Sequence, residues 1–405
     1  MKMAAGGMHD LAVIGAGPAG AATAFHAARA GLRVVLLDMA RFPRDKICGD
    51  GLTMRAVAEL QALGVEPEVR RQAALIRRFE LSAPLARVQS PLSGAGEADY
   101  AYVLPRLKLD PLLVQAAVGA GAELREQHEL HTWETADDHL RLQLKTPTGE
   151  RSLQARYAVL ACGAHLGPLM RMRLLARKPA VMVAVRQYYE NYQSDDDLWR
   201  LQFRRETAPG YGWVFPAGPG LANVGVGLYA NRDHARPAEW LEQYCRRTAA
   251  PLLRGARPLG QPRSFPLRTD FLRAPLTAPR VLITGEAAGL VNPLTGEGID
   301  YALESGRIAA EQARALLERG DDGNAHAAAL HARYADLFRL SEGLRDWCAT
   351  PMGVSLLTLA AHWRPELRLR LIRVLFGGEV IQGRLTARRL LRRLLLPSRR
   401  SGAGA

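Results

Sequence analysis

A strand–turn–helix–strand pattern near the N-terminus constrains this chain more than any other feature. Residues 11–14 (LAVI) form a short apolar run that ends in the glycine-rich turn GAGPAG at residues 15–20. An alanine-rich stretch with helical character continues to Ala30, and a second apolar run over residues 32–37 ends at Asp38. The sequence therefore predicts a βαβ unit with a glycine turn between its first strand and its helix, which is the fingerprint of a dinucleotide-binding fold.

Each glycine of this turn has its own physical reason. The first allows the tight turn, the second lets a pyrophosphate approach the backbone, and the third lets the helix pack closely on the strand. The helix N-terminus adds unpaired N–H groups and a positive dipole that attract phosphate, and the carboxylate after the second strand can accept hydrogen bonds from ribose hydroxyls. The residues expected to bind the dinucleotide here are Gly15, Gly17, Pro18, Ala19, Gly20 and Asp38.

The composition is that of a globular protein with a substantial core. The chain has 405 residues, of which 48% are hydrophobic and 23% charged, and this length favours about two or three domains. No segment offers the roughly 18 consecutive apolar residues of a transmembrane helix, and the residues before Met8 are too few and too polar for a secretory signal. Four cysteines without a CxxC spacing indicate a reducing compartment. We therefore expect a cytoplasmic protein.

The net charge of +14 leaves two interpretations open. The basic surface is either simply solvated or it attracts an anionic partner. We find no nucleic-acid-binding signature and expect no nucleic acid partner. Residues 385–396 (LTARRLLRRLLL) have helical spacing, with leucines on one face and arginines on the other. Such a helix either docks on the protein or makes a peripheral contact with the anionic inner face of a membrane.

The order of the expected elements indicates an α/β (α+β) fold with a discontinuous first domain. Strand-like runs separated by Pro/Gly turns recur between residues 179 and 229, which indicates an antiparallel sheet. We expect a Rossmann-like domain that this sheet interrupts, followed by C-terminal helices. The expected boundaries are 8–75, 100–175 and 275–345 for the Rossmann-like domain, 76–99 and 176–274 for the sheet domain, and 346–405 for the helical region.

Two further glycine-containing loops are expected to contact the ligand of the βαβ unit. Residues 285–298 (GEAAGLVNPLTGEG) follow a buried strand and precede a helix. Glu286 stands at the end of that strand, where its carboxylate can reach a ribityl or ribose hydroxyl, and the helix N-terminus would direct its dipole at a flavin N1–C2=O region that becomes negative on reduction. Residues 41–51 carry basic side chains for phosphates, and Cys48 lies there in a sharply turned context or is an idle surface thiol.

Two other segments hold candidate residues. Arg106 precedes a helix expected over residues 110–119, with Asp110 as its N-cap and Pro111 as its first residue. Residues 210–216 (GYGWVFP) place three aromatic side chains on one strand, where they either belong to the core or line a pocket for a flat ring. No Ser/His/Asp triad and no metal-ligand spacing is found, so we expect no metal site.

Taken in order, these motifs resemble one family. The segments DLAVIGAGPAGAATA, DKICGDGL, PRLKLDPLL, VLACGAHLGPLMR, GYGWVFP and TGEAAGLVNPLTGEGI are similar to the geranylgeranyl reductase family of FAD-dependent oxidoreductases, whose fold is that of para-hydroxybenzoate hydroxylase. The resemblance covers roughly residues 8–320. Two departures stand out: Glu286 replaces the family's usual Asp, and Cys162 stands where an Asp is common.

The resemblance implies FAD as the cofactor and NAD(P)H or another reductant as a transient electron donor. Besides the residues of the βαβ unit, it implies cofactor contacts at Arg44, Cys48, Gly49, Arg106, Gly285, Glu286, Pro293, Gly296, Gly298 and Ile299. It places the substrate pocket at Tyr211, Trp213 and Phe215, and makes Cys48 and Asp50 the catalytic candidates.

Three functions are weighed on this basis. The leading hypothesis is reduction of C=C bonds in a hydrophobic, isoprenoid substrate. The first alternative is an NAD(P)H-dependent monooxygenase that hydroxylates an aromatic or polyketide-like compound, and the second is an electron-transfer flavoprotein that reduces a quinone. Only one dinucleotide fingerprint occurs, so no separate NAD(P)H domain is expected.

Overall fold

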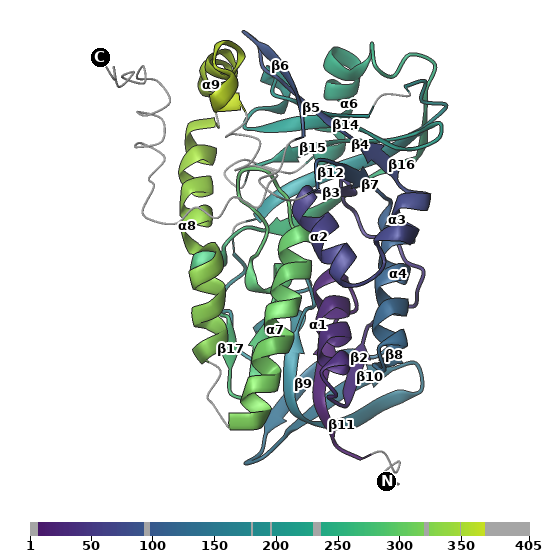
Figure 1. Cartoon of the computed structure of the whole chain (residues 1–405), viewed down its shortest axis with the longest axis vertical. Helices are drawn as coiled ribbons and strands as arrows, with labels where there is room; N and C mark the ends of the chain where they lie inside the picture. The colour runs from purple at the N-terminus through teal and green to yellow at the C-terminus, as the bar shows by residue number, and fades with distance from the viewer. Residues whose placement is uncertain are drawn as a thin grey trace, which may run out of the picture.

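The computed structural model describes residues 7–92, 98–179, 181–194, 197–229, 236–319, 324–348 and 350–368. The amphipathic segment 385–396 and the end of the expected helical region lie outside the described residues. The molecule is elongated, with a helix-covered sheet at one end and a second sheet at the other (Figure 1).

The first sheet carries the N-terminal unit. Its strands follow the order β17-β18-β11-β1-β2-β8, with β9 and β10 forming an antiparallel extension of β11. Five strands of this order are parallel to their neighbours: β18 (Val281–Ile283), β11 (Gly149–Leu160), β1 (His9–Ile14), β2 (Val34–Leu37) and β8 (Glu123–Arg125). The antiparallel members are β17 (Thr277–Ala278), β9 (Glu129–Thr135) and β10 (Leu140–Thr146).

Helices cover one face of this sheet. The central helix α1 (Pro18–Arg29) packs between α4 (Arg106–Gly119) and α7 (Ile299–Arg319), as Figure 1 shows. The alanines of α1 allow this close packing, because Ala21, Ala22 and Ala24 are buried against the neighbouring elements. The carboxyl ends of β1, β2 and β11 meet at the N-terminus of α1, which places the glycine turn at the edge where such folds bind ligands.

The second sheet has seven strands in the order β16-β12-β15-β14-β13-β5-β6. All pairs are antiparallel except β13 with β5, which is parallel. Helix α6 (Pro237–Tyr244) packs against one face. The strands are β16 (Arg257–Arg268), β12 (Val181–Glu190), β15 (Leu221–Leu228), β14 (Gly210–Gly218), β13 (Leu198–Gln202), β5 (Arg78–Ser82) and β6 (Arg87–Pro91).

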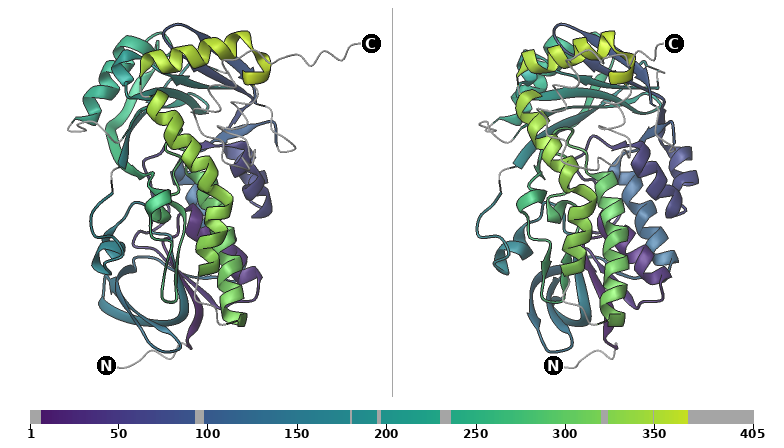
Figure 2. Two further views of the ribbon diagram at one scale, coloured as in Figure 1. Left: turned by 90° about the vertical axis from the view of Figure 1, so that its left-hand side faces the viewer. Right: turned by 60° about the vertical axis from the view of Figure 1, so that its left-hand side comes forward.

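Shorter elements join the two parts. A three-stranded sheet of β3 (Gly51–Leu52), β7 (Ala101–Val103) and β4 (Ala74–Ile76) lies between the larger sheets, next to α2 (Met54–Ala62) and α3 (Glu66–Gln72). The short α5 (Gly167–Arg171) follows β11. Two long helices follow α7 along the chain: α8 (Asn324–Cys348) runs beside it, and α9 (Pro351–Trp363) lies across the far end of the second sheet (Figure 2).

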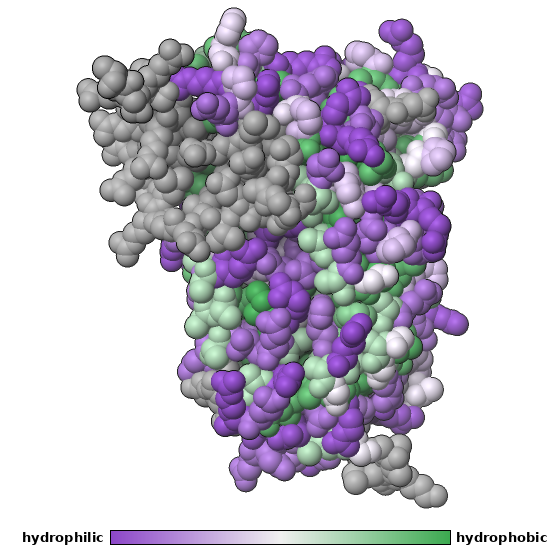
Figure 3. All heavy atoms as spheres, in the orientation of Figure 1, coloured by the Kyte–Doolittle hydropathy of each residue, from purple (hydrophilic) through white to green (hydrophobic). Residues whose placement is uncertain are grey.

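This architecture confirms the expected fold class: a Rossmann-like sheet, a largely antiparallel second sheet and C-terminal helices. Hydrophilic side chains are spread over both ends of the face seen in Figure 3. Among the described helices, none combines the length and the apolar content needed to cross a bilayer.

One helix start was predicted wrongly. Helix α4 begins at Arg106 with Pro105 as its N-cap, five residues before the expected first residue Pro111 and N-cap Asp110. Pro111 lies inside the helix instead of at its first position. The buried carboxylate of Asp110 binds arginine side chains instead of capping the helix, so the tertiary ion pairs described below replace the local capping role that the sequence suggested.

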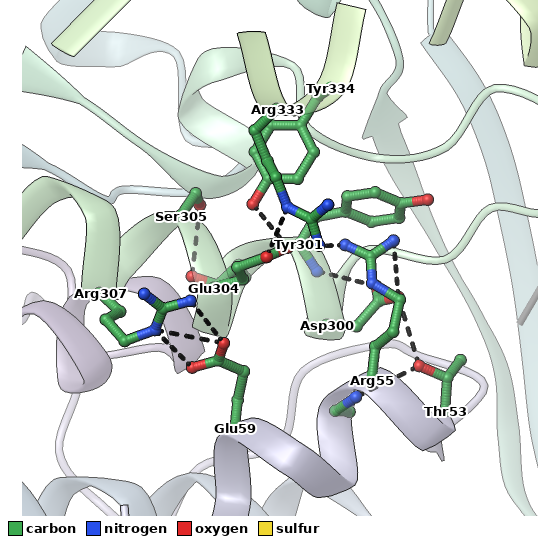
Figure 4. A network of polar contacts seen from close by, with 12 residues as sticks. Thr53, Arg55, Glu59, Asp300, Tyr301, Glu304, Ser305, Arg307, Arg333 and Tyr334 are labelled. Atoms are coloured by element: carbon green, nitrogen blue, oxygen red, sulfur yellow. Dashed lines mark hydrogen bonds and ion pairs between the residues drawn. The ribbon is translucent and has the colours of Figure 1, made fainter. Parts of the chain in front are cut away.

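A buried ion-pair network fastens α7 to α2 and α8 (Figure 4). Arg55 on α2 donates to Glu304 on α7 at 2.8 Å and stacks on the ring of Tyr301, with 4.4 Å between its Cζ and the ring centroid. Arg333 and Tyr334 on α8 donate to the same carboxylate at 2.7 and 2.9 Å. One carboxylate therefore joins three helices.

Replacing Arg55 by Leu is expected to destabilise the protein by about 3–5 kcal/mol, because it takes a cation away from two buried carboxylates: Asp300 loses its ion pair with Arg55, and Glu304 keeps Arg333 alone of its two arginines. The free energy of unfolding in urea measures this cost. Arg314→Leu, which removes an exposed pair with Glu318 on the same helix, is the matched control and is expected to cost less than about 1 kcal/mol. Equal losses in the two variants would contradict a structural role for the buried network.

Candidate active site

A cavity of about 410 Å³ lies between the carboxyl ends of the parallel strands and the inner face of the second sheet. Most of the candidate residues line it together, although they come from segments far apart in the sequence. They are Gly15, Gly17, Pro18, Ala19, Asp38, Arg44, Cys48, Gly49, Asp50, Arg106, Tyr211, Trp213, Phe215, Glu286, Gly296, Gly298 and Ile299. Gly20, Gly285 and Pro293 lie outside the lining.

The glycines of the first turn have two different roles: some are required for packing, and one faces the space for a ligand. A Cβ on Gly20 would stand 1.7 Å from the carbonyl oxygen of Gly15, so helix and turn could not pack as they do. Gly15 has φ +100° and approaches Ala161, whose carbonyl oxygen would lie 2.4 Å from an added Cβ. Gly17 differs, because the nearest atoms to its added Cβ are arginine nitrogens at 3.6 and 3.8 Å.

Two arginines stand over the N-terminus of α1. The nitrogens near Gly17 belong to Arg44 and Arg106. Asp110 holds both: its Oδ2 lies 2.9 Å from Arg44 and 2.8 Å from Arg106, and its Oδ1 accepts a second bond from Arg106 at 2.6 Å. Guanidinium groups held in place beside a helix N-terminus fit a pyrophosphate. Asp110 was not among the predicted site residues, because its role depends on two side chains that only the fold brings to it.

Asp38 is buried and fixed by the backbone. Its Oδ2 accepts the N–H of Ala16 at 2.7 Å, and its Oδ1 accepts the N–H of Ala40 at 2.8 Å. Each carboxylate oxygen has a further lone pair, and the residue lines the cavity. The position therefore fits the recognition of ribose hydroxyls at the end of β2.

The second glycine loop brings Glu286 to the wall of the cavity. Lys46 donates to its Oε2 at 2.7 Å, and the backbone N–H of Arg268 donates to its Oε1 at 3.3 Å. Gly285 has φ +60° and touches α1, because its added Cβ would stand 2.6 Å from Cβ of Ala19. The two glycine loops thus lie against each other, as one extended dinucleotide held at both ends would require.

Residues 48–50 form a strained loop that the second sheet holds in place. Asp50 is buried in the left-handed region with φ +63°. Its carboxylate accepts hydrogen bonds from the Tyr188 hydroxyl, from Asn223 Nδ2 at 2.8 Å and from the backbone N–H of Arg106 at 3.3 Å. Burial raises its pKa to about 6 against the lowering effect of these hydrogen bonds. These contacts favour a positioning role for Asp50.

Cys48 lies on the same loop and faces the cavity. Burial, together with the nearby negative charge of Asp50, raises the pKa of its thiol to about 11. The sulfur is therefore a neutral thiol at physiological pH, which makes it a poor nucleophile but leaves it a proton to donate.

Asn223 links this loop to the aromatic strand, so its substitution tests the loop. Its Nδ2 donates to the Cys48 carbonyl and to Asp50, while its Oδ1 accepts the Trp213 indole N–H at 2.9 Å.

Asn223→Leu is expected to lower the free energy of unfolding by about 2–4 kcal/mol, because it leaves buried polar groups without partners. Urea unfolding measures the change, with Gln143→Leu on β10 as a control. A loss below about 1 kcal/mol would contradict this role.

The opposite wall of the cavity is apolar and aromatic. Tyr211, Trp213 and Phe215 point from β14 towards it, and their neighbouring rings lie 6.2 Å apart. Trp199 on β13 extends the wall, with its ring centroid 5.6 Å from that of Phe215. Met182, Leu201 and Leu267 line it as well. Sequence reasoning missed these four residues, since isolated apolar positions on strands carry no signal of which face meets a ligand.

Sequence reasoning also missed Glu297. It lines the cavity between Gly296 and Gly298, and its Oε1 would lie 3.6 Å from a Cβ on Gly51. Burial, and next the negative charge of Asp300, raise the pKa of Glu297 well above its usual range. Asp300 is the better-stabilised anion, since Thr53 donates to it at 3.2 Å and Arg55 lies 3.9 Å away. The direction of this shift favours the protonated form of Glu297. The one sequence feature that pointed to Glu297 was its position in the glycine-containing loop 285–298.

Comparison with known proteins agrees with this geometry. Residues 8–169 match the FAD binding domain family, and residues 181–256 match the geranylgeranyl reductase catalytic domain. The menaquinone reductase of Mycolicibacterium smegmatis is 36% identical over 318 residues, which is 75% of each chain. Digeranylgeranylglycerophospholipid reductase 1 of Methanopyrus kandleri is 31% identical over 377 residues, 89% of this chain and 92% of the relative.

A solved structure shares the whole architecture. The geranylgeranyl bacteriochlorophyll reductase-like protein of Thermoplasma acidophilum superposes with a TM-score of 0.81 over 96% of this chain and 99% of its own, at 20% identity. That likeness shows the fold, and the sequence relatives show the family. The chain belongs to the geranylgeranyl reductase family of FAD-dependent oxidoreductases.

Proposed function

We propose that this protein reduces a carbon–carbon double bond in the isoprenoid chain of a lipid substrate. The observation that carries the proposal is a carboxylic acid, Glu297, whose pKa is raised well above its usual range and which lines a cavity whose other wall is aromatic and apolar. The names of the relatives support it. Menaquinone and digeranylgeranylglycerophospholipid are different lipids, and both carry unsaturated isoprenoid chains.

The cofactor is assigned to the polar half of the cavity. Gly15 to Gly20, Asp38, Arg44 and Arg106 would hold the ADP half of FAD, by the turn, ribose and pyrophosphate interactions already described. Glu286 would bind the ribityl chain, with Lys46 orienting its carboxylate. Residues 293–299 would lie along the flavin ring. The electron donor is a nicotinamide or another reductant that visits the same cavity.

The apolar half is assigned to the substrate. FAD held there would supply, in its reduced form, the hydride for one carbon of the double bond. The other carbon then needs a proton, and Glu297 is placed to donate it and to be left as a carboxylate that solvent reprotonates. Tyr211 fixes the loop that carries this acid, because its hydroxyl donates to the Thr295 carbonyl. Cys48 is the second proton donor to consider, since its thiol is neutral and faces the same space.

Single-turnover reduction tests this function and separates it from the alternatives. The FAD-loaded protein is reduced with dithionite under nitrogen and mixed with menaquinone or with a digeranylgeranyl glycerophospholipid. The expected product has gained one pair of hydrogens in its isoprenoid chain and keeps them after exposure to air. A product reduced only in the quinone ring, which air reoxidises, would support the electron-transfer alternative. A hydroxylated product formed only with oxygen would support the monooxygenase.

A further inference from the structure

Helix α9 presents an apolar stripe to solvent. Met352, Leu356, Leu359 and Trp363 are 62%, 44%, 36% and 75% exposed. They recur every three or four residues, so they share one face of the helix. No charged residue occurs between 351 and 361. A helix on the surface of a globular protein normally turns polar side chains outward, so this stripe requires an explanation.

The other face of α9 packs towards the cavity. Val354 and Ala361 are buried in the same apolar cluster as Trp199, Tyr211 and Phe215, which form the aromatic wall. Figure 2 shows α9 lying across the end of the molecule, next to β6. The buried face of α9 and the aromatic wall of the cavity therefore belong to one continuous apolar cluster.

A neighbouring turn extends the apolar surface. Leu85 is exposed on the turn between β5 and β6. The ring of His362, near the end of α9, hydrogen-bonds the carbonyl oxygen of Arg87 through Nδ1 at 3.4 Å, which joins the helix to this hairpin. Apolar residues from two adjoining elements thus project at the same end of the molecule.

Charge identifies the surface that would cover the stripe. The chain carries a net charge of +14, and residues 364–400 hold eleven arginines and only two glutamates. A second copy of so basic a protein would be repelled, whereas an anionic lipid surface would be attracted. A helix with Trp and Leu on one face and basic residues beside it is typical of segments that lie in the membrane interface. With 13 residues, α9 is well short of the roughly 20 needed to span a bilayer.

We propose that α9 and the β5–β6 turn form a docking surface for an anionic lipid bilayer. The surface inserts Leu85 and the four apolar side chains of α9 among the acyl chains, and the net positive charge of the protein favours an anionic bilayer over a neutral one. This proposal rests on the proposed function: an isoprenoid lipid dissolved in the bilayer would then lie close to the apolar half of the cavity.

Vesicle sedimentation of the full-length, FAD-loaded protein tests the docking surface. Wild-type protein is expected to bind phosphatidylglycerol-containing vesicles and to bind phosphatidylcholine vesicles far less. Leu356→Ser/Trp363→Ser should weaken binding at least about tenfold. The control Leu259→Ser/Val118→Ser changes two similarly exposed residues on β16 and α4 and should bind like wild type. Failure of wild type to bind the anionic vesicles, or equal binding by the α9 variant, would overturn the proposal.

Fluorescence quenching locates the contact on α9 directly. Vesicles with brominated acyl chains should quench wild-type tryptophan emission more than that of Trp363→Phe, because Trp363 would enter the acyl layer. Equal quenching of the two proteins would overturn the proposal, since binding would then occur through another surface. Neither measurement involves an isoprenoid substrate or turnover, so a failure here is distinguishable from a failure of the proposed reduction.

Discussion

Glu297→Gln should reduce the rate of substrate reduction by about 10²- to 10⁴-fold, the usual contribution of a positioned general acid. The amide has the shape of the protonated carboxyl group but no acidic proton. FAD binding should persist, because glutamine has nearly the same size as glutamate and leaves the expected ribose and pyrophosphate contacts at Asp38, Arg44 and Arg106 unchanged. The measurement is the rate at which substrate reoxidises dithionite-reduced protein under nitrogen, followed by flavin absorbance.

The pH dependence of the same reaction gives an independent test. A general acid must be protonated to act, so the rate should fall as the pH rises through the raised pKa of Glu297. Asp300→Asn removes the negative charge that helps to raise this pKa, so the fall should move to lower pH. Glu297→Asp keeps the acidic group one methylene further away and should recover part of the rate.

Cys48→Ser is the matched control for the acid. If Glu297 supplies the proton, the serine variant should keep most of the reduction rate, since a hydroxyl of similar size preserves the packing of the loop. If Glu297→Gln reduces substrate as fast as wild type and Cys48→Ser loses most of the reduction rate, the thiol of Cys48 is the proton donor and Glu297 is not.

The contrast between Gly17 and Glu297 shows what the sequence could reveal. The glycine turn was recognisable because its spacing, its flanking strands and Asp38 all lie within one local unit of chain. The aromatic strand and the second glycine loop were recognisable as local patterns too. Glu297 had only a weak signal, its place in the second glycine loop, because what makes it a strong candidate is the raised pKa that its surroundings in the cavity and the neighbouring Asp300 give it.

Long-range contacts explain the other omissions. Asp110 was expected to cap a helix, since a short polar residue before Pro111 is a good local start signal. In the structure it binds Arg44 and Arg106, and one of these lies more than sixty positions earlier in the chain. Similarly, the parallel pairing of β5 with β13 joins two segments that no local pattern relates. The fold class followed from local periodicity, whereas these interactions required the tertiary structure.

Gly20→Ala should prevent stable folding, whereas Gly17→Ala should fold and bind FAD poorly. An added Cβ on Gly20 meets the Gly15 carbonyl oxygen at 1.7 Å, a backbone atom that cannot rotate away, so a loss of about 3 kcal/mol or more is expected. Gly17 has an ordinary extended backbone with φ −73°, and an added Cβ would make only ordinary van der Waals contacts with the ends of Arg44 and Arg106. Alanine there should change the free energy of unfolding by less than about 0.5 kcal/mol.

The methyl group of Gly17→Ala would instead occupy the space in which a pyrophosphate must approach the helix N-terminus. The FAD dissociation constant should therefore rise at least about tenfold, equivalent to 1.4 kcal/mol, and titration of the apoprotein with FAD measures it. Gly119→Ala is the control for both variants, because its added Cβ meets no atom within 4 Å at the end of α4. Normal FAD affinity in Gly17→Ala would contradict the assignment of the pyrophosphate to this turn, since no other property of that glycine makes alanine unacceptable.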